Sequence, residues 1–269
     1  MPFAEDVKRS LIAAAAASGV ELLVLDNEYS AAIAQKNAEE FIKAKVDLVI
    51  EFQIDEQVAP LIADKIAEAG IPLIAIDIPH PHATYFGVDN FKVGLEAGIL
   101  LGEHARRHWD SKVDCVLGLD IEEAGALVQS RITGAFEGIR KTIPNVPSNA
   151  FVRVDSRGLQ EKSRRIVTDF LGRHPKDHRI LVAASTDSAA LGAFEAAREI
   201  GRTKDLAIVG QDCIPEVMEV MQEPGSPIIG SISHQAETYG PRLIELGISM
   251  LQGRSIPPCT LLRQPPLCT

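Results

Sequence analysis

The sequence predicts an α/β protein built from two doubly wound, Rossmann-like lobes with parallel sheets. Short β-branched segments alternate with amphipathic helical segments along the chain, which is the pattern of right-handed βαβ units. The strand segments are almost continuously apolar, as in parallel strands that helices cover on both faces. The length of 269 residues suits two domains better than one very wide sheet.

The expected strands share runs of Val, Ile and Leu, and the expected helices share apolar residues at three- and four-residue spacing. In chain order the strands are 21–25, 47–51, 72–77, 84–88, 112–119, 150–155, 179–184, 206–210 and 228–233. The helices are 5–18, 30–44, 56–69, 91–107, 125–141, 159–173, 187–200, 215–222 and 238–252. Gly19 and Gly70 follow helical segments and precede strands, as glycines at helix C-termini do.

The start of the chain departs from the doubly wound pattern. Its first element is the helical segment 5–18, although such a lobe normally opens on a strand. We expect either that this strand lies before Met1 in the natural protein or that the chain lacks it. The absence of an inner strand would leave hydrogen-bonding groups of its neighbours unpaired.

Charge and hydropathy argue against several classes of function. The net charge is −10, from 27 basic and 37 acidic residues, so we expect no direct nucleic-acid contact by this chain. No stretch approaches the ~20 apolar residues of a membrane span. The N-terminus lacks the basic-then-apolar pattern of a signal peptide. The compartment stays open, because a mature exported chain and a cytosolic chain look alike in this respect.

Motifs that would indicate catalysis or a cofactor are also missing. No GxGxxG or GxxxxGK[ST] loop follows a strand, and no GxSxG or nucleophile–His–carboxylate set is evident. We therefore expect no enzyme and no cofactor. His80 and His82 in a Pro-rich stretch offer at most two metal ligands, so we expect a surface turn and no metal site.

The four cysteines are Cys115, Cys213, Cys259 and Cys268, and none of them forms a CxxC pair. Cys115 lies in an apolar run and is expected to be a small buried residue. We expect four unpaired thiols. A bridge between Cys259 and Cys268 in an oxidising compartment is the alternative that the spacing leaves open.

Several expected strands end in an aspartate. The carboxyl ends of parallel strands face the ligand crevice in open α/β sheets, so these carboxylates are candidates to line a cleft. The alternative is that each one caps the following helix or turn. The residues are Asp26, Asp77, Asp120, Asp155 and Asp212.

Eight motifs carry a resemblance to a known family. The most specific is FGVDNFKVGLEAG at 86–98. The others are PFAEDVKRSL (2–11), LVLDNEYS (23–30), AEAGIPLIAIDIP (67–79), RITGAF (131–136), ASTDSAALGAFEAARE (184–199), LAIVGQD (206–212) and IIGSISHQAETYG (228–240). Together they resemble type I periplasmic sugar-binding proteins of the ribose-binding kind, and equally the effector domains of lac-type repressors, which share that fold.

The resemblance implies a periplasmic-binding-protein type I fold, with two lobes joined by a three-strand hinge. The N-terminal lobe would comprise residues 1–89 plus 235–260. The C-terminal lobe would comprise residues 90–234 plus 261–269.

The resemblance also implies ligand-binding residues. Phe3 would stack on a sugar ring, and Asp77 and Asp212 would accept hydrogen bonds from hydroxyls. Arg131 would donate to ligand oxygens, and His234 lies where the family often has Gln. From the residues alone, the alternatives are a hydrophobic staple for Phe3, a solvated charge pair for Arg131 and a structural role for His234.

Thr186 and Asp187 stand where the family usually has Asn-Asp, and they complete the implied ligand set. The sequence also departs from the pattern. Met1 and Ala4 replace an Asn and a Phe, and Ile78 stands where ribose binders place an Arg. These changes argue against assuming ribose as the ligand, because single polar contacts can redirect specificity.

By resemblance, the chain is a solute-binding protein that holds a small sugar or polyol in the cleft between the lobes and delivers it to an ABC-type transporter by hinge closure. Its partner would be a membrane permease. Its location would be periplasmic or extracellular, with or without a lipid anchor. The alternative is the ligand-sensing effector domain of a lac-type transcriptional regulator, which would be cytoplasmic, with a DNA-binding domain outside this chain.

Overall fold

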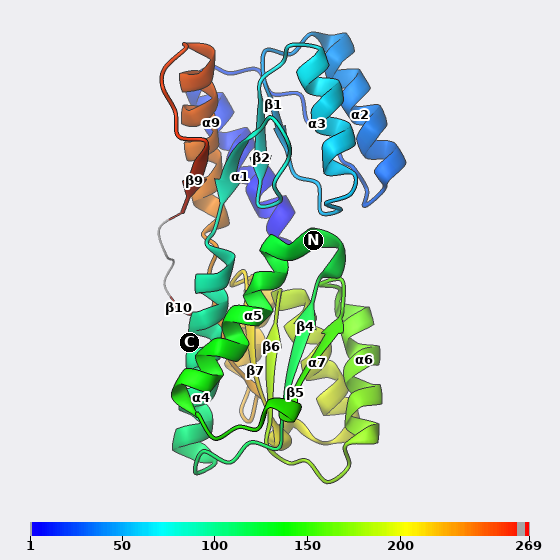
Figure 1. Cartoon of the computed structure of the whole chain (residues 1–269), viewed down its shortest axis with the longest axis vertical. Helices are drawn as coiled ribbons and strands as arrows, with labels where there is room; N and C mark the ends of the chain where they lie inside the picture. The colour runs from blue at the N-terminus through cyan, green and yellow to red at the C-terminus, as the bar shows by residue number, and fades with distance from the viewer. Residues whose placement is uncertain (1, 263–266, 269) are drawn as a thin grey trace. The chain divides into compact units, whose positions relative to one another are not determined.

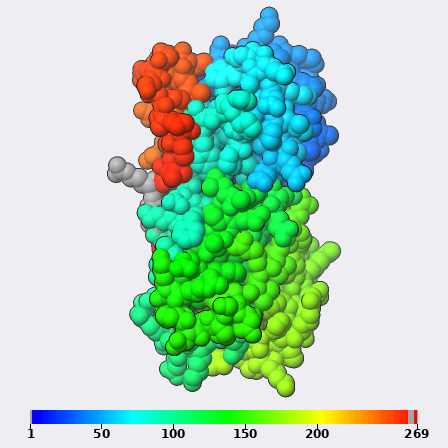
Figure 2. All heavy atoms as spheres, in the orientation of Figure 1, coloured from blue at the N-terminus to red at the C-terminus, as the bar shows by residue number. Residues whose placement is uncertain are grey.

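The structure is a computed structural model that describes residues 2–262 and 267–268, which are coloured in Figure 2. The described residues form two compact units. Unit 1 comprises residues 2–88, 123–125 and 235–262, and unit 2 comprises 89–122, 126–234 and 267–268.

Unit 1 contains a four-stranded parallel sheet in the order β1-β2-β3-β9 (Figure 1). The strands are β1 (Val49–Glu51), β2 (Leu73–Ile76), β3 (Thr84–Gly87) and β9 (Cys259–Leu261). The helices are α1 (Pro2–Ser18), α2 (Ala31–Ala44), α3 (Ala59–Glu68) and α9 (Ala236–Leu251). One core cluster joins α2 and α3 to β1 and β2 through Ile62, Ile66 and Leu73.

Helices α1 and α9 of unit 1 pack closely because α9 carries a glycine at the contact. A Cβ atom on Gly240 would lie 2.1 Å from the Ser10 carbonyl oxygen of α1. The Ser10 hydroxyl donates to the Glu237 carbonyl at 2.7 Å. This pairing positions Phe3 and Tyr239 in the same aromatic cluster, where their ring centroids are 5.4 Å apart.

Unit 2 contains a six-stranded sheet in the order β10-β8-β7-β6-β4-β5, in which β10 is antiparallel to β8 and the other pairs are parallel. The strands are β4 (Cys115–Asp120), β5 (Phe151–Asp155), β6 (Ile180–Ala184), β7 (Leu206–Gln211), β8 (Ile228–Ile232) and β10 (Leu267–Cys268). The α-helices are α4 (Asn90–His108), α5 (Gly125–Thr142), α6 (Gln160–Arg173), α7 (Asp187–Ile200) and α8 (Pro215–Met221).

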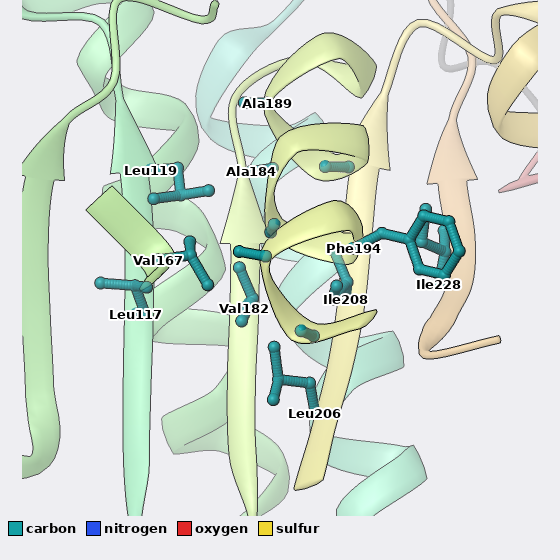
Figure 3. Close-up of a cluster of buried hydrophobic side chains, with 14 of the residues drawn as sticks. Leu117, Leu119, Val167, Val182, Ala184, Ala189, Phe194, Leu206, Ile208 and Ile228 are labelled. Atoms are coloured by element: carbon teal, nitrogen blue, oxygen red, sulfur yellow. The ribbon is translucent and has the colours of Figure 1, made fainter. Parts of the chain in front are cut away.

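Helices cover both faces of the unit 2 sheet, which explains why its inner strands are continuously apolar. Leu117 and Leu119 of β4 face a core that Phe194 of α7 also enters (Figure 3). Gly118 points the other way, and a Cβ there would lie 2.4 Å from Ile132 of α5. Every residue of β4, β6 and β7 is buried.

The predicted alternation of helices and parallel strands is confirmed, with one exception. The expected strand at 21–25 is wrong, because residues 20–26 form no strand in the structure. The run is apolar enough for a strand, but it pairs with no strand in the part of the chain that the structure describes, where β2 is the only partner of β1. Strands β9 and β10 were not predicted, because each is short and its position depends on pairing with a strand that is distant in the sequence, β3 for β9 and β8 for β10.

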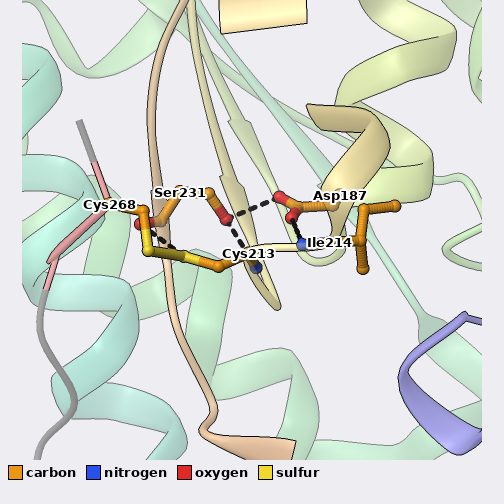
Figure 4. The surroundings of a disulfide bond; sticks show 5 residues. All are labelled: Asp187, Cys213, Ile214, Ser231 and Cys268. Carbon is orange, nitrogen blue, oxygen red and sulfur yellow. Dashed lines mark hydrogen bonds between the residues drawn. A yellow bond between two sulfur atoms is a disulfide. The ribbon is translucent and has the colours of Figure 1, made fainter. Parts of the chain in front are cut away.

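A disulfide bond joins Cys213 to Cys268, 55 residues apart (Figure 4). Antiparallel pairing with β8 places Cys268 opposite Ser231, and the Cys213 amide donates to the Ser231 hydroxyl at 3.1 Å. The expectation of four unpaired thiols is therefore wrong, and so is the Cys259–Cys268 alternative. Cys115 is free and buried, as expected, whereas Cys259 is free and exposed.

Candidate functional site

The carboxyl ends of β7 and β8 in unit 2 bring together an imidazole, a carboxylate and an amide. Asp212 follows β7 with a φ of 118°, which directs the chain sharply out of the strand. His234 follows β8, and its Nδ1 lies 3.2 Å from Asp212 Oδ1. Its Nε2 lies 3.2 Å from Gln211 Oε1. His234 is only 1% exposed, so the ring is fixed between two oxygen-bearing side chains.

Asp187 is the first residue of α7, lies near Asp212 and is completely buried. Its Oδ2 accepts from the Ile214 amide at 2.9 Å, and its Oδ1 accepts from the Ser231 hydroxyl at 2.7 Å (Figure 4). Burial raises the pKa of Asp187 well above its ordinary range, and the nearby charge of Asp212 raises it further. Asp187 therefore connects β8 to the loop that follows β7 and begins with Asp212.

Thr186 is the N-cap residue of α7 and is also engaged within the fold. Its hydroxyl oxygen accepts from the Ala189 amide at 3.1 Å, and the hydroxyl donates to the Gly158 carbonyl at 2.9 Å. An N-cap bond of this kind satisfies one of the unpaired amides at a helix start. Thr186 therefore orders the start of the helix that carries Asp187.

Arg131 lies on α5 with its guanidinium buried, and it is 6% exposed. Its Nε donates to Asn90 Oδ1 at 2.6 Å, and its Nη1 donates to the Ser185 carbonyl at 3.1 Å. The alternative of a solvated surface pair is wrong, because the partners of Arg131 are a buried amide and a backbone carbonyl just after β6. These bonds hold the guanidinium plane in one orientation.

Unit 1 presents an aspartate within an aromatic cluster. Asp77 follows β2 with a left-handed φ of 58° and is 3% exposed. The hydroxyl of fully buried Tyr239 donates to Asp77 Oδ1 at 3.1 Å. The Tyr239 ring contacts Phe3 and Phe86 at centroid distances of 5.4 and 5.2 Å. Gly87 leaves room for this carboxylate, since a Cβ there would lie 2.5 Å from Asp77 Oδ1.

Three other aspartates at the ends of predicted strands form local bonds. Asp26 accepts from the Glu28 amide at 2.8 Å, and Asp155 accepts from the Arg157 amide at 3.1 Å. In both turns the carboxylate accepts from the backbone amide two residues later, as in an Asx turn. Asp120 is completely buried, and its Oδ1 accepts from the next backbone amide in the chain at 2.8 Å. The turn alternative therefore describes Asp26 and Asp155, whereas Asp120 also forms an ion pair across the sheet, with its Oδ2 3.1 Å from Arg153 Nη1.

The expectation of a surface turn at the histidines is wrong for His80. This side chain is 7% exposed, because the ring folds back until Nδ1 lies 2.9 Å from the Ile78 carbonyl oxygen of its own turn. Burial lowers the pKa of His80. His82 is exposed, with Nε2 3.8 Å from Asp64 Oδ1. Within residues 2–262 and 267–268, no group of three His, Cys, Asp or Glu side chains is arranged to hold a metal ion.

The implied ligand residues fall into two sets. Phe3 and Asp77 belong to unit 1, and the structure joins them through Tyr239. The remaining five belong to unit 2 and are Arg131, Thr186, Asp187, Asp212 and His234.

Sequence reasoning missed three residues that hold these sets in place, namely Tyr239, Ser231 and Gln211. The only sequence signal for Tyr239 was its position beside Gly240 in a motif of the resemblance. In the part of the chain that the structure describes, no helix is long and apolar enough to cross a bilayer.

Two doubly wound units with polar side chains at the carboxyl ends of their strands define a ligand-binding α/β protein. The sequence matches the periplasmic binding protein domain family over residues 1–255. The chain therefore belongs to this family of solute-binding proteins, which are not enzymes. The predicted family and fold class are confirmed.

Solved structures agree on the fold. An ABC transporter periplasmic solute-binding protein from Actinobacillus succinogenes with bound D-allose aligns with a TM-score of 0.84 and 21% identity, covering 100% of this chain and 93% of that one. A solute-binding protein from Mycobacterium smegmatis with bound glycerol aligns with a TM-score of 0.86 and 20% identity, covering 100% of this chain and 90% of that one. A solute-binding protein from Bacillus halodurans with bound myo-inositol aligns with a TM-score of 0.82 and 19% identity, covering 100% of this chain and 91% of that one. No curated protein sequence matches the chain.

Proposed function

We propose that the chain is the solute-binding protein of an ABC-type transporter and that its solute is a small sugar or polyol. The observation that carries this proposal is the cluster of Asp212 with the buried side chains of His234 and Gln211 at the carboxyl ends of β7 and β8. A sugar hydroxyl donates one hydrogen bond and accepts others. Asp212 would accept from such a hydroxyl, and Arg131 would donate to a second one.

The solved relatives support a polyhydroxylated solute. Structures similar to this chain are described with bound D-allose, glycerol, myo-inositol and allitol. These ligands share neighbouring hydroxyl groups and carry no charge. Asp77 in unit 1 would supply a further acceptor, as the resemblance implies. A solute that bonds groups of both units would favour a closed state, which a membrane permease would then recognise.

The disulfide bond favours transport over transcriptional regulation. Disulfides persist in oxidising compartments and are rare in the cytosol, where a lac-type regulator works. The Cys213–Cys268 bond therefore supports a periplasmic or extracellular location.

The proposal is tested by a thermal-shift screen of uncharged monosaccharides and polyols. A cognate solute at 100 times its dissociation constant is expected to stabilise the protein by about 2.7 kcal/mol. Asp212→Asn is expected to weaken binding at least ~10-fold, because a hydrogen bond to a charged group is worth about 1.5–3 kcal/mol.

The matched control is Asp169→Asn, since Asp169 is 72% exposed on α6 and lies outside both sets. We expect it to bind as the parent does. The proposal fails if no member of the panel shifts the melting temperature, or if Asp212→Asn binds as tightly as the control variant.

A further inference from the structure

Strand β10 lies along the outer side of β8 in the sheet of unit 2. Its two residues are paired with two residues of β8, Leu267 with Ile232 and Cys268 with Ser231. Strands usually have about 3–10 residues, so the backbone bonds of β10 hold it only weakly. The disulfide between Cys268 and Cys213 supplies a covalent attachment to the loop after β7 (Figure 4).

That loop has an unfavourable backbone conformation at two successive residues. Asp212 has a φ of 118° and Cys213 a φ of 56°. Residues with a side chain occupy such regions only where the surrounding structure holds them there. Without that restraint the loop would relax toward ordinary φ values, and the direction of the Asp212 side chain would change.

The loop and β10 are attached to the same two residues of β8 from opposite sides. On the β7 side, the Asp212 amide donates to the Ile232 carbonyl at 2.9 Å, and the Cys213 amide donates to the Ser231 hydroxyl at 3.1 Å. On the other side, β10 pairs with Ile232 and Ser231. The disulfide therefore crosses β8 and joins the two segments that flank it.

This attachment lies one residue from the candidate solute site. Asp212 directly precedes Cys213, and its Oδ1 lies 3.2 Å from His234 Nδ1. A carboxylate that is already held in place accepts a hydrogen bond without the entropic cost of ordering its loop on binding. If the loop were released from β10, that cost would fall on the binding step and lower the affinity.

We propose that the Cys213–Cys268 disulfide is a positioning element that fixes the Asp212 carboxylate beside His234 and makes solute affinity depend on the redox state of the bridge. This inference rests on the proposed function, in which Asp212 accepts from a solute hydroxyl.

The reductant of this switch is a dithiol. It transfers two electrons and two protons to the two protein sulfur atoms, so that the S–S bond breaks, two protein thiols form and the dithiol becomes a disulfide. Cys213 and Cys268 are both partly exposed, which gives the reductant access to the bridge. Reduction would leave β10 with its short backbone pairing alone.

The first test is an NMR measurement that needs no sugar. The ring-nitrogen signals of His234, identified by their loss in His234→Gln, are compared under conditions in which each protein is folded. We expect them to shift in Cys268→Ser and in the parent treated with dithiothreitol. They should not shift in the control Cys259→Ser, because Cys259 is free and exposed. A loss of stability alone does not move the signals of the folded state.

The second test is a double-mutant cycle on solute affinity, measured by titration calorimetry. The probes are D-allose, myo-inositol, allitol and glycerol, the solutes bound in similar structures. We expect Cys268→Ser to weaken binding at least ~10-fold. Asp212→Asn should weaken binding at least ~10-fold when the bridge is present and less than ~3-fold in the Cys268→Ser background, because a mobile carboxylate contributes little.

Two results would overturn the proposal. Unchanged His234 signals in Cys268→Ser would mean that hydrogen bonds alone hold Asp212 in place. Equal effects of Asp212→Asn with and without the bridge would mean that the disulfide stabilises unit 2 but positions nothing. Shifted His234 signals in a protein that binds no sugar or polyol would contradict the proposed function and still support the positioning of Asp212, so the two failures are distinguishable.

Discussion

Replacing Cys268 with Ser removes the bond that ties β10 to the loop after β7. The bond closes a loop across 55 residues. The chain-entropy relation for a loop of that size gives about 14 cal/mol/K, or about 4 kcal/mol at 25 °C. We expect Cys268→Ser to destabilise unit 2 by this amount, because the disulfide lowers the conformational entropy of the unfolded chain and the variant lacks that restriction.

The assay uses the only tryptophan of the sequence, Trp109, which lies in unit 2 at the end of α4. Its fluorescence therefore follows the unfolding of unit 2 in urea. With a slope of about 2 kcal/mol/M, the loss of about 4 kcal/mol lowers the urea midpoint by about 2 M.

The matched control is Cys259→Ser, since Cys259 is free and exposed. It should unfold as the parent does, and a reducing agent should shift the parent curve onto that of Cys268→Ser. The prediction is wrong if parent and Cys268→Ser unfold at the same urea concentration without reductant. It is also refuted if four thiols rather than two react in the unfolded, unreduced protein.

Four further predictions concern packing and charge. Gly98→Val in α4 should cost more than ~3 kcal/mol or prevent folding, since a Cβ there would lie 2.0 Å from the Ala135 carbonyl of α5. By contrast, Gly172→Ala should raise the free energy of unfolding by about 0.5–1 kcal/mol, because a Cβ there would have no atom within 4 Å and alanine favours the helix. Equal urea midpoints for the two glycine variants would contradict both predictions. Burial raises the pKa of Glu51 from 4.5 to about 7, so the native state favours the protonated form. The contribution of Glu51 to the stability of unit 1 should be fully present below pH 4.5 and should fall by about 3 kcal/mol as the pH rises to about 7. Circular dichroism melts of the parent and of Glu51→Gln should therefore differ in their pH dependence over this range, and equal slopes in the two proteins would rule the prediction out. Tyr239→Phe deletes a donor to a buried carboxylate and should cost about 1–3 kcal/mol in chemical denaturation, whereas a neutral result would mean that another group satisfies that oxygen.

The fold could be predicted well from the sequence where the signal was local. Helix α7 illustrates this, because the structure places it at Asp187–Ile200, the range that its apolar spacing indicated. Strands β4, β6 and β7 were recognisable because burial on both faces requires apolar side chains at every position. The segment 21–25 has the same local signal and still forms no strand, because a strand also needs a partner edge.

The candidate site was predictable by residue type but not by role. Asp187 and Asp212 both looked like ligand carboxylates, yet the partners of Asp187 are Ser231 and the Ile214 amide. The bonds between Tyr239 and Asp77 and between Cys213 and Cys268 join residues 162 and 55 positions apart. No local pattern encodes such pairs.

The sequence by itself determined the succession of helices and strands and the family, because hydrophobic periodicity and short motifs act over a few neighbouring residues. Only the tertiary structure decided which aspartates are bound within the fold, which cysteines pair and which apolar segment forms no strand. Those outcomes depend on which backbone edges and side chains meet after the chain has folded.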